Sequence, residues 1–96
     1  MAANVVCKNV VRQGGLWTFQ FFAPRREDLA SPVLTDYAAK YIEEQGHKMM
    51  GVPLRTTAAY PVDDHYKPLF RDGDPVASDL AQHLHGFMCD YQVYVE

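Results

Sequence analysis

The chain has few of the features that mark secreted, membrane-bound or disulfide-stabilised proteins. It holds only two cysteines, Cys7 and Cys89, in 96 residues, and these could pair only if the first and last strands were neighbours. No apolar run is long enough to cross a bilayer, and the first 25 residues lack the apolar stretch of a signal peptide. We therefore expect a cytoplasmic protein with reduced thiols and no membrane partner.

Basic residues are also scarce, with 9 Lys and Arg against 12 Asp and Glu and a net charge of -3. Because a nucleic-acid binder needs clustered cations against the phosphates, nucleic acid is not the expected partner. The chain also lacks a Gly-rich phosphate loop, a nucleophile elbow, a dinucleotide fingerprint and the CxxC and HExxH patterns. These absences predict no cofactor, no bound metal and no catalytic constellation.

What the chain does contain is typical of one folded domain spanning residues 1–96. Hydrophobic residues make up 48% and charged residues 22% of the sequence, an ordinary balance for a globular protein. The Val-rich segment 4–12 and the aromatic segment 16–23 read as two strands, and the glycines between them suit a tight turn. Alternation places Trp17, Phe19 and Phe21 on one face of the second strand. The sequence thus predicts a β-hairpin at the start of the fold.

The rest of the chain predicts two helices and two further strands. Ser31-Pro32 and Asp74-Pro75 have the residues of helix starts, with Ser31 and Asp74 as N-caps. Gly46 would end the first helix, and Gly86 the second. A third strand is expected within residues 53–62, bounded by prolines. A last strand over residues 88–95 would turn four residues inward: Cys89, Tyr91, Val93 and Val95. The order β-β-α-β-α-β predicts an α+β fold, with a roughly four-stranded antiparallel or mixed sheet and two helices packed on one face.

The closing segment, HLHGFMCDYQVYVE, resembles a cluster of metal ligands at first sight. On a helix, however, His83 and His85 point roughly 200° apart and cannot share one metal ion. Cys89 falls on the inward phase of the last strand, where it is a small core residue and not a nucleophile. The segment therefore predicts the end of a helix and a strand.

The expected loop over residues 63–73, DDHYKPLFRDG, is the other place where chemistry could lie. Its acids do not have the spacing of a calcium-binding loop. Asp63, Asp64 and His65, together with His85, could still form the pocket of a small enzyme or ligand-binding α+β domain. This is the alternative function that the sequence leaves open. Tyr66 and Phe70 give the same loop apolar groups suited to docking.

The leading hypothesis is a small non-enzymatic regulator or inhibitor that acts by occupying the surface of a protein partner. The profile suits the stand-alone proteins that viruses and mobile elements encode. If the last strand lies at a sheet edge, it could pair with a partner strand or with a second copy of the chain. The residues expected to bind the partner are Tyr66, Phe70, Asp90, Gln92, Tyr94 and Glu96.

Overall fold

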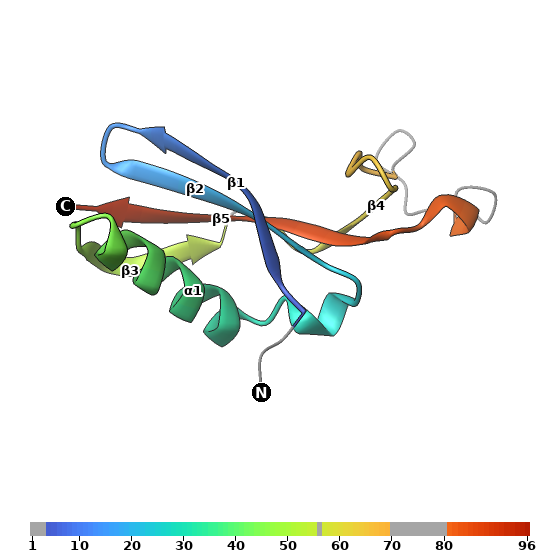
Figure 1. The fold of residues 1–96 in the computed structure, drawn as a ribbon, viewed down its shortest axis with the longest axis horizontal. Helices are drawn as coiled ribbons and strands as arrows, with labels where there is room; N and C mark the ends of the chain where they lie inside the picture. The colour runs from blue at the N-terminus through green and yellow to red at the C-terminus, as the bar shows by residue number, and fades with distance from the viewer. Residues whose placement is uncertain (1–3, 56, 70–80) are drawn as a thin grey trace.

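A computed structural model describes residues 4–55, 57–69 and 81–96 of the chain, without the side chains of residues 52–55 and 81 (Figure 1). These residues form a small α+β domain built on one curled antiparallel sheet. In chain order the elements are β1 (Val6–Gln13), β2 (Leu16–Ala23), a 3-10 turn (Arg26–Asp28), α1 (Ser31–Glu44), β3 (Met49–Arg55), β4 (Tyr60–Val62), a second 3-10 turn (Ala81–His83) and β5 (Gly86–Val95). No helix in these ranges is both long and apolar enough to cross a membrane.

The last strand lies in the middle of the sheet. The strand order is β1-β2-β5-β3, and β4 also pairs with β5, so the described sheet has five strands where four were expected. β3 pairs with the second half of β5 and β4 with its first half, both antiparallel. The single strand predicted over 53–62 is therefore two short strands on one side of β5. Each contains a proline. Proline has no backbone N–H, so a strand tolerates it at a position that does not have to donate a hydrogen bond to a neighbouring strand.

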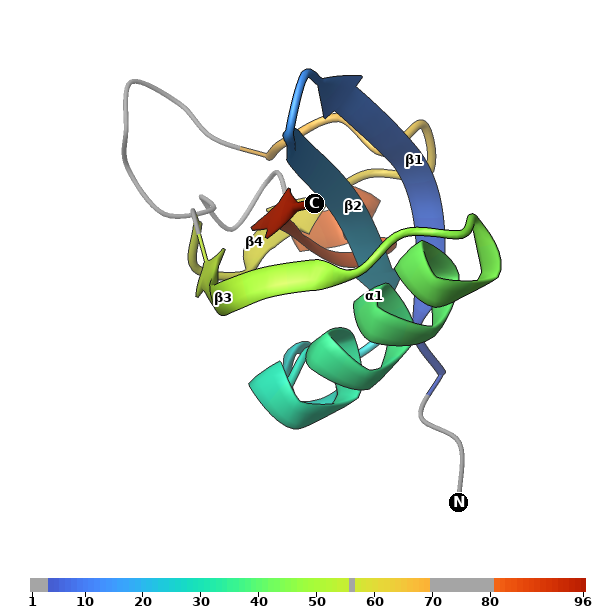
Figure 2. The same ribbon diagram turned by 90° about the vertical axis from the view of Figure 1, so that its left-hand side faces the viewer.

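The predicted hairpin and its inward face are confirmed. β1 pairs with β2 in antiparallel register, and Gly14 takes a positive φ of 59° in the turn. Side chains of β2 and β5 that alternate onto one face form the core together with three residues of α1, because alternation sends every second residue to the same side. Figure 2 shows α1 lying against this face, and α1 is the one α-helix in the part of the chain that the structure describes. The residues that β2, α1 and β5 bury in this core are Trp17, Phe19, Phe21, Ala23, Leu34, Ala38, Ile42, Cys89, Tyr91, Val93 and Val95.

The two cysteines are free because β2 separates their strands. Cys7 on β1 and Cys89 on β5 both lie opposite Phe21 of β2, one on each side. Two strand spacings of about 4.8 Å put the backbones too far apart for a disulfide. Cys89 is buried, and Cys7 is partly buried.

The start of α1 differs from the prediction, and its end agrees with it. Ala30, not Ser31, is the N-cap, and no side chain caps the helix. Ser31 is already helical, so the helix depends on burial of its apolar stripe instead of on a serine cap. At the other end Gly46 has a φ of 82°, and the N–H of His47 donates to the carbonyl of Ile42 (3.0 Å). This is the glycine-terminated helix end that the sequence indicates.

The predicted second helix is wrong over the part that the structure describes. Its start at Asp74-Pro75 lies outside the described residues, and α1 is the one α-helix within them. Its expected last turn is a 3-10 turn, Ala81–His83. Gly86 begins β5 and does not stop a helix. The reason is local: the N–H of His85 donates to the carbonyl of Val62 (2.9 Å), which draws the chain alongside β4 before β5 begins.

Candidate interaction surface

The predicted docking edge on the last strand is not an edge. β2 binds one side of β5, and β3 and β4 bind the other, so the backbone groups of β5 are used within the sheet. A partner strand therefore cannot add to β5, whether it comes from another protein or from a second copy. What Asp90, Gln92 and Tyr94 can offer a partner is confined to their side chains.

Asp90 and Glu96 take part in the fold at the two ends of this segment. The N–H of Asp90 donates to the hydroxyl of Thr57 (2.8 Å), which ties β5 to the connection between β3 and β4. Burial, followed by the nearby Asp90 carboxylate, raises the pKa of Tyr60. The N–H of Glu96 donates to the carbonyl of Lys48 (2.9 Å), and its own carbonyl lies 3.1 Å from Nδ1 of His47. Both residues hold segments of the fold together, and Asp90 is partly buried whereas Glu96 is exposed.

Gln92 and Tyr94 lie on the side of the sheet that α1 leaves uncovered. Strand pairing places them beside residues of the three other long strands that point the same way. We name this surface the open face and define it by six uncharged residues: Val11, Leu16, Thr18, Met50, Gln92 and Tyr94.

The open face consists of two rows across the sheet. One row joins Leu16 of β2, Tyr94 of β5 and Met50 of β3 as directly paired residues. The other joins Val11 of β1, Thr18 of β2 and Gln92 of β5. Within it, Nε2 of Gln92 donates to the hydroxyl of Thr18 (3.1 Å). Because cross-strand neighbours lie about 5 Å apart, each row is a continuous surface.

Exposed apolar side chains gather on this side of the sheet. Val11 is 39% exposed, Met50 49% and Tyr94 50%. Val6, 51% exposed, lies on the same side, opposite Phe22 at the far end of β1. Single exposed apolar residues are ordinary, but neighbouring ones on a flat face are typical of interaction sites.

The other end of this side is covered by residues 60–69, where Tyr66 lies. The ring of Tyr66 packs against Phe22 (5.1 Å between centroids) and His85 (5.6 Å), and Nζ of Lys8 sits 4.2 Å from its centroid. Tyr66 also has a positive φ of 63°, which costs a bulky residue energy. Tyr66 is thus held in an aromatic cluster. Phe70, its predicted companion, lies outside the described residues.

The fold brings together only some of the four residues predicted for the pocket of a small enzyme or ligand-binding domain, which are Asp63, Asp64, His65 and His85. The carboxylate of Asp63 accepts the N–H groups of His65 (2.8 Å) and Lys67 (3.0 Å), and the bond from Lys67 is the main cause of its lowered pKa. Asp64 lies 3.7 Å from Nε2 of the exposed His65. Asp64 and His85 line one hollow of about 250 Å³. Across residues 4–55, 57–69 and 81–96 no three acids, histidines or cysteines are grouped to hold a metal ion.

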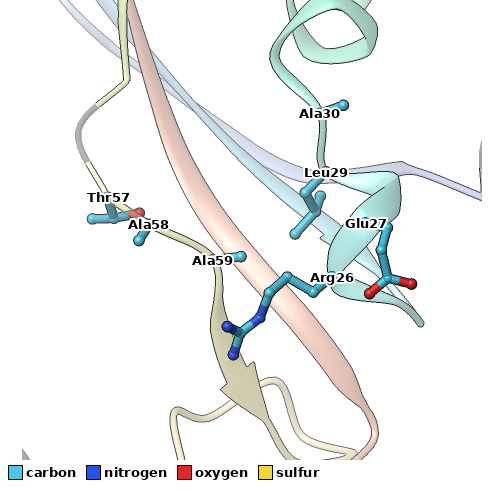
Figure 3. A pocket seen from close by; sticks show the side chains of 7 residues that line it. All are labelled: Arg26, Glu27, Leu29, Ala30, Thr57, Ala58 and Ala59. Atoms are coloured by element: carbon cyan, nitrogen blue, oxygen red, sulfur yellow. The ribbon is translucent and has the colours of Figure 1, made fainter.

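A larger hollow, of about 620 Å³, is lined by none of the open-face residues, and Figure 3 shows the side chains that do line it. One wall is the connection into α1, residues 26–30, and the other is the connection from β3 to β4, residues 57–59. No sequence pattern predicts this hollow, because it depends on two connections that the sheet brings together from distant parts of the chain.

Comparison of the chain with models of protein families, with curated proteins and with solved structures gives no match.

Proposed function

We propose that this protein is a non-enzymatic regulator or inhibitor that occupies the surface of a protein partner through its open face. The observation that carries the proposal is the row of Leu16, Tyr94 and Met50, in which directly paired apolar residues stand on the face of the sheet opposite α1. Tyr and Met are among the residues enriched in protein interfaces, where charged residues are depleted at the centre. The open face has this composition.

The chemistry of the open face favours a protein over a nucleic acid. None of its six side chains carries a charge, and binding to phosphates depends on Lys and Arg. A protein partner would cover the face with apolar groups and meet Thr18 and Gln92 with hydrogen bonds. Gln92 and Tyr94, which the sequence predicts as partner-binding residues, remain part of this proposal. They would contact the partner through their side chains and not through the backbone of an edge strand.

The alternative, a small enzyme, has less support. Asp63 is engaged by two backbone N–H groups, which favours a role in shaping the turn. Alanine substitution of His65 and His85 tests it directly, since an enzyme that uses either imidazole would lose its activity.

The test compares Tyr94→Glu with Leu84→Glu as baits in a lysate of the source organism. Both add one negative charge at a side chain of similar exposure, 50% and 45%, but Leu84 lies outside the open face. We expect a protein captured by the wild type and by Leu84→Glu and lost with Tyr94→Glu. The purified protein should then bind wild type at least about tenfold more tightly than Tyr94→Glu.

Circular dichroism must first show that both variants keep the wild-type fold. Equal capture by the wild type and Tyr94→Glu would contradict the proposal. So would sedimentation of the wild type as a stable dimer that Tyr94→Glu dissociates, because the open face would then be occupied by a second copy of the chain.

A further inference from the structure

The hollow between the two connections has the size of a small-molecule site. Its volume of about 620 Å³ falls within the range of about 300–1,000 Å³ that ligand pockets occupy. It shares no residue with the open face, so what binds there is independent of the proposed function.

Its lining combines apolar and polar surface, and the apolar part comes from Leu29 and from small residues. Leu29, only 2% exposed, belongs to the core and forms the fixed floor. Three alanines, Ala30, Ala58 and Ala59, supply the rest of the apolar lining, and their small side chains leave the space open. Arg26, Glu27 and Thr57 supply the polar part. Figure 3 shows the two walls facing each other, with Ala30 on one and Ala58 on the other. The hollow can therefore accept an apolar body.

One cation stands at the mouth of the hollow. The guanidinium of Arg26 lies 4.9 Å from the centroid of Phe87, and Figure 3 shows it reaching toward Ala59. Among the described residues nothing accepts a hydrogen bond or forms a salt bridge with Arg26. The ring of Phe87 holds the guanidinium in place by a cation–π contact and leaves its N–H donors for a ligand.

The neighbouring acid, Glu27, also lines the hollow and is attracted to Arg26, but its main partner is Arg25. Nε and Nη2 of Arg25 both donate to one carboxylate oxygen of Glu27, at 3.2 and 3.1 Å, and this pairing is the main cause of the lowered pKa of Glu27. The start of α1 adds to the positive potential, because Ala30 lines the hollow and caps the helix without a side-chain hydrogen bond. The potential at the mouth is suited to a single negative charge.

We propose that this hollow binds a small organic carboxylate, with its carboxylate on Arg26 and its apolar body against Leu29, Ala58 and Ala59. A guanidinium forms two parallel hydrogen bonds with a carboxylate, which fixes the ligand's orientation. The apolar part of the lining supplies further affinity, so the ligand is a monoacid with a hydrocarbon body and not a bare inorganic anion.

The experiment is a titration of ¹⁵N-labelled protein with hexanoate, followed by the backbone amide shifts of residues 29, 30, 58 and 59. We expect saturable shifts with a dissociation constant on the order of 1 mM for a ligand of this size. Two compounds serve as controls: hexanamide has the same chain without the charge, and inorganic phosphate has the charge without the chain. Each should bind at least about tenfold more weakly than hexanoate.

Two variants and one control complete the test. Arg26→Gln should weaken hexanoate binding about tenfold or more, and Ala58→Leu should abolish the shifts by filling the hollow. Lys48→Gln, which removes the same charge at the opposite end of α1, should bind as the wild type does. Absence of saturable shifts, equal binding of hexanamide or phosphate, or unchanged binding by Arg26→Gln would each overturn the proposal.

Discussion

The guanidinium of Arg12 lies over the indole ring of Trp17, with Cζ 4.1 Å from the ring centroid. The two residues are directly paired across the β1–β2 hairpin. Nη2 of Arg12 also donates to Oε1 of Gln45 (3.2 Å), so the same side chain connects the hairpin to the C-terminal end of α1. A cation at this end of a helix is also favoured by the helix dipole.

Arg12→Ala should destabilise the fold by about 1 kcal/mol, because it removes an exposed cation–π contact and a hydrogen bond between hairpin and helix. Urea unfolding monitored by Trp17 fluorescence measures the change. Lys40→Ala, which removes the same charge from the exposed side of α1, should change stability by less than about 0.5 kcal/mol. Equal effects of the two substitutions would show that the contact with Trp17 contributes nothing.

Gly86→Ala should destabilise the protein by about 2 kcal/mol or more, as overpacking of a core does. A Cβ there would lie 2.5 Å from two ring atoms of Phe22 and 2.6 Å from the carbonyl of Ala23, and the backbone carbonyl cannot rotate away. Thermal unfolding compares it with Gly14→Ala, where the added methyl meets nothing within 4 Å and the positive φ is the one penalty. A smaller loss for Gly86→Ala than for Gly14→Ala would contradict the packing at the start of β5.

The carboxylate of Asp63 should make the stability of the protein depend on acid pH. Its pKa is lowered in the folded state by the N–H groups it accepts, so its contribution is complete above the unfolded pKa of about 3.9 and is lost as the pH falls through the lower folded value. Asp63→Asn should therefore flatten the fall of the melting temperature between about pH 4 and pH 2. Identical pH profiles for the variant and the wild type would remove this role.

The two thiols should differ in reactivity. Burial raises the pKa of Cys7, so less of it is thiolate at neutral pH and its alkylation should be slower than that of a free cysteine. Its raised pKa also means that its contribution to stability is lost as the pH rises through the folded value. Cys89, 0% exposed, should react only on unfolding. Cys7→Ser should abolish labelling of the native protein by iodoacetamide, and residual native labelling would show that β5 opens.

The local sequence pattern predicted which strand residues point into the core and where the first helix ends. The inward residues of β2 and β5 and the glycine end of α1 follow from neighbours in the sequence, and the structure confirms them. The strand order could not be predicted in the same way, because it depends on which strand fills the gap between β2 and β3. Because β5 fills this gap, Tyr94 lies on a face of the sheet and not on an edge strand.

The candidate surface illustrates the same limit. Tyr94 and Gln92 were predicted from their outward phase on the last strand. Val11, Leu16 and Met50 were not, because only the cross-strand register brings them beside Tyr94. The prediction of a helix ending at Gly86 was wrong because glycine has two common uses. It ends helices, and it also fits where an aromatic ring lies close to the backbone, as the ring of Phe22 does at Gly86. Sequence alone does not distinguish these two uses.

The central place of β5 has a consequence for the synthesis of the protein. The β1–β2 hairpin joins neighbouring segments and can form as soon as both have left the ribosome, but β3 and β4 pair with β5 alone among the described strands. Translation proceeds at about 5–20 residues per second. For several seconds, therefore, Phe19 and Phe21 of β2 have been synthesised while β5, the strand that pairs beside them, has not. Completion of the sheet must then wait for β5, and until β5 is made the nascent chain presents an apolar sheet surface to the chaperones around it.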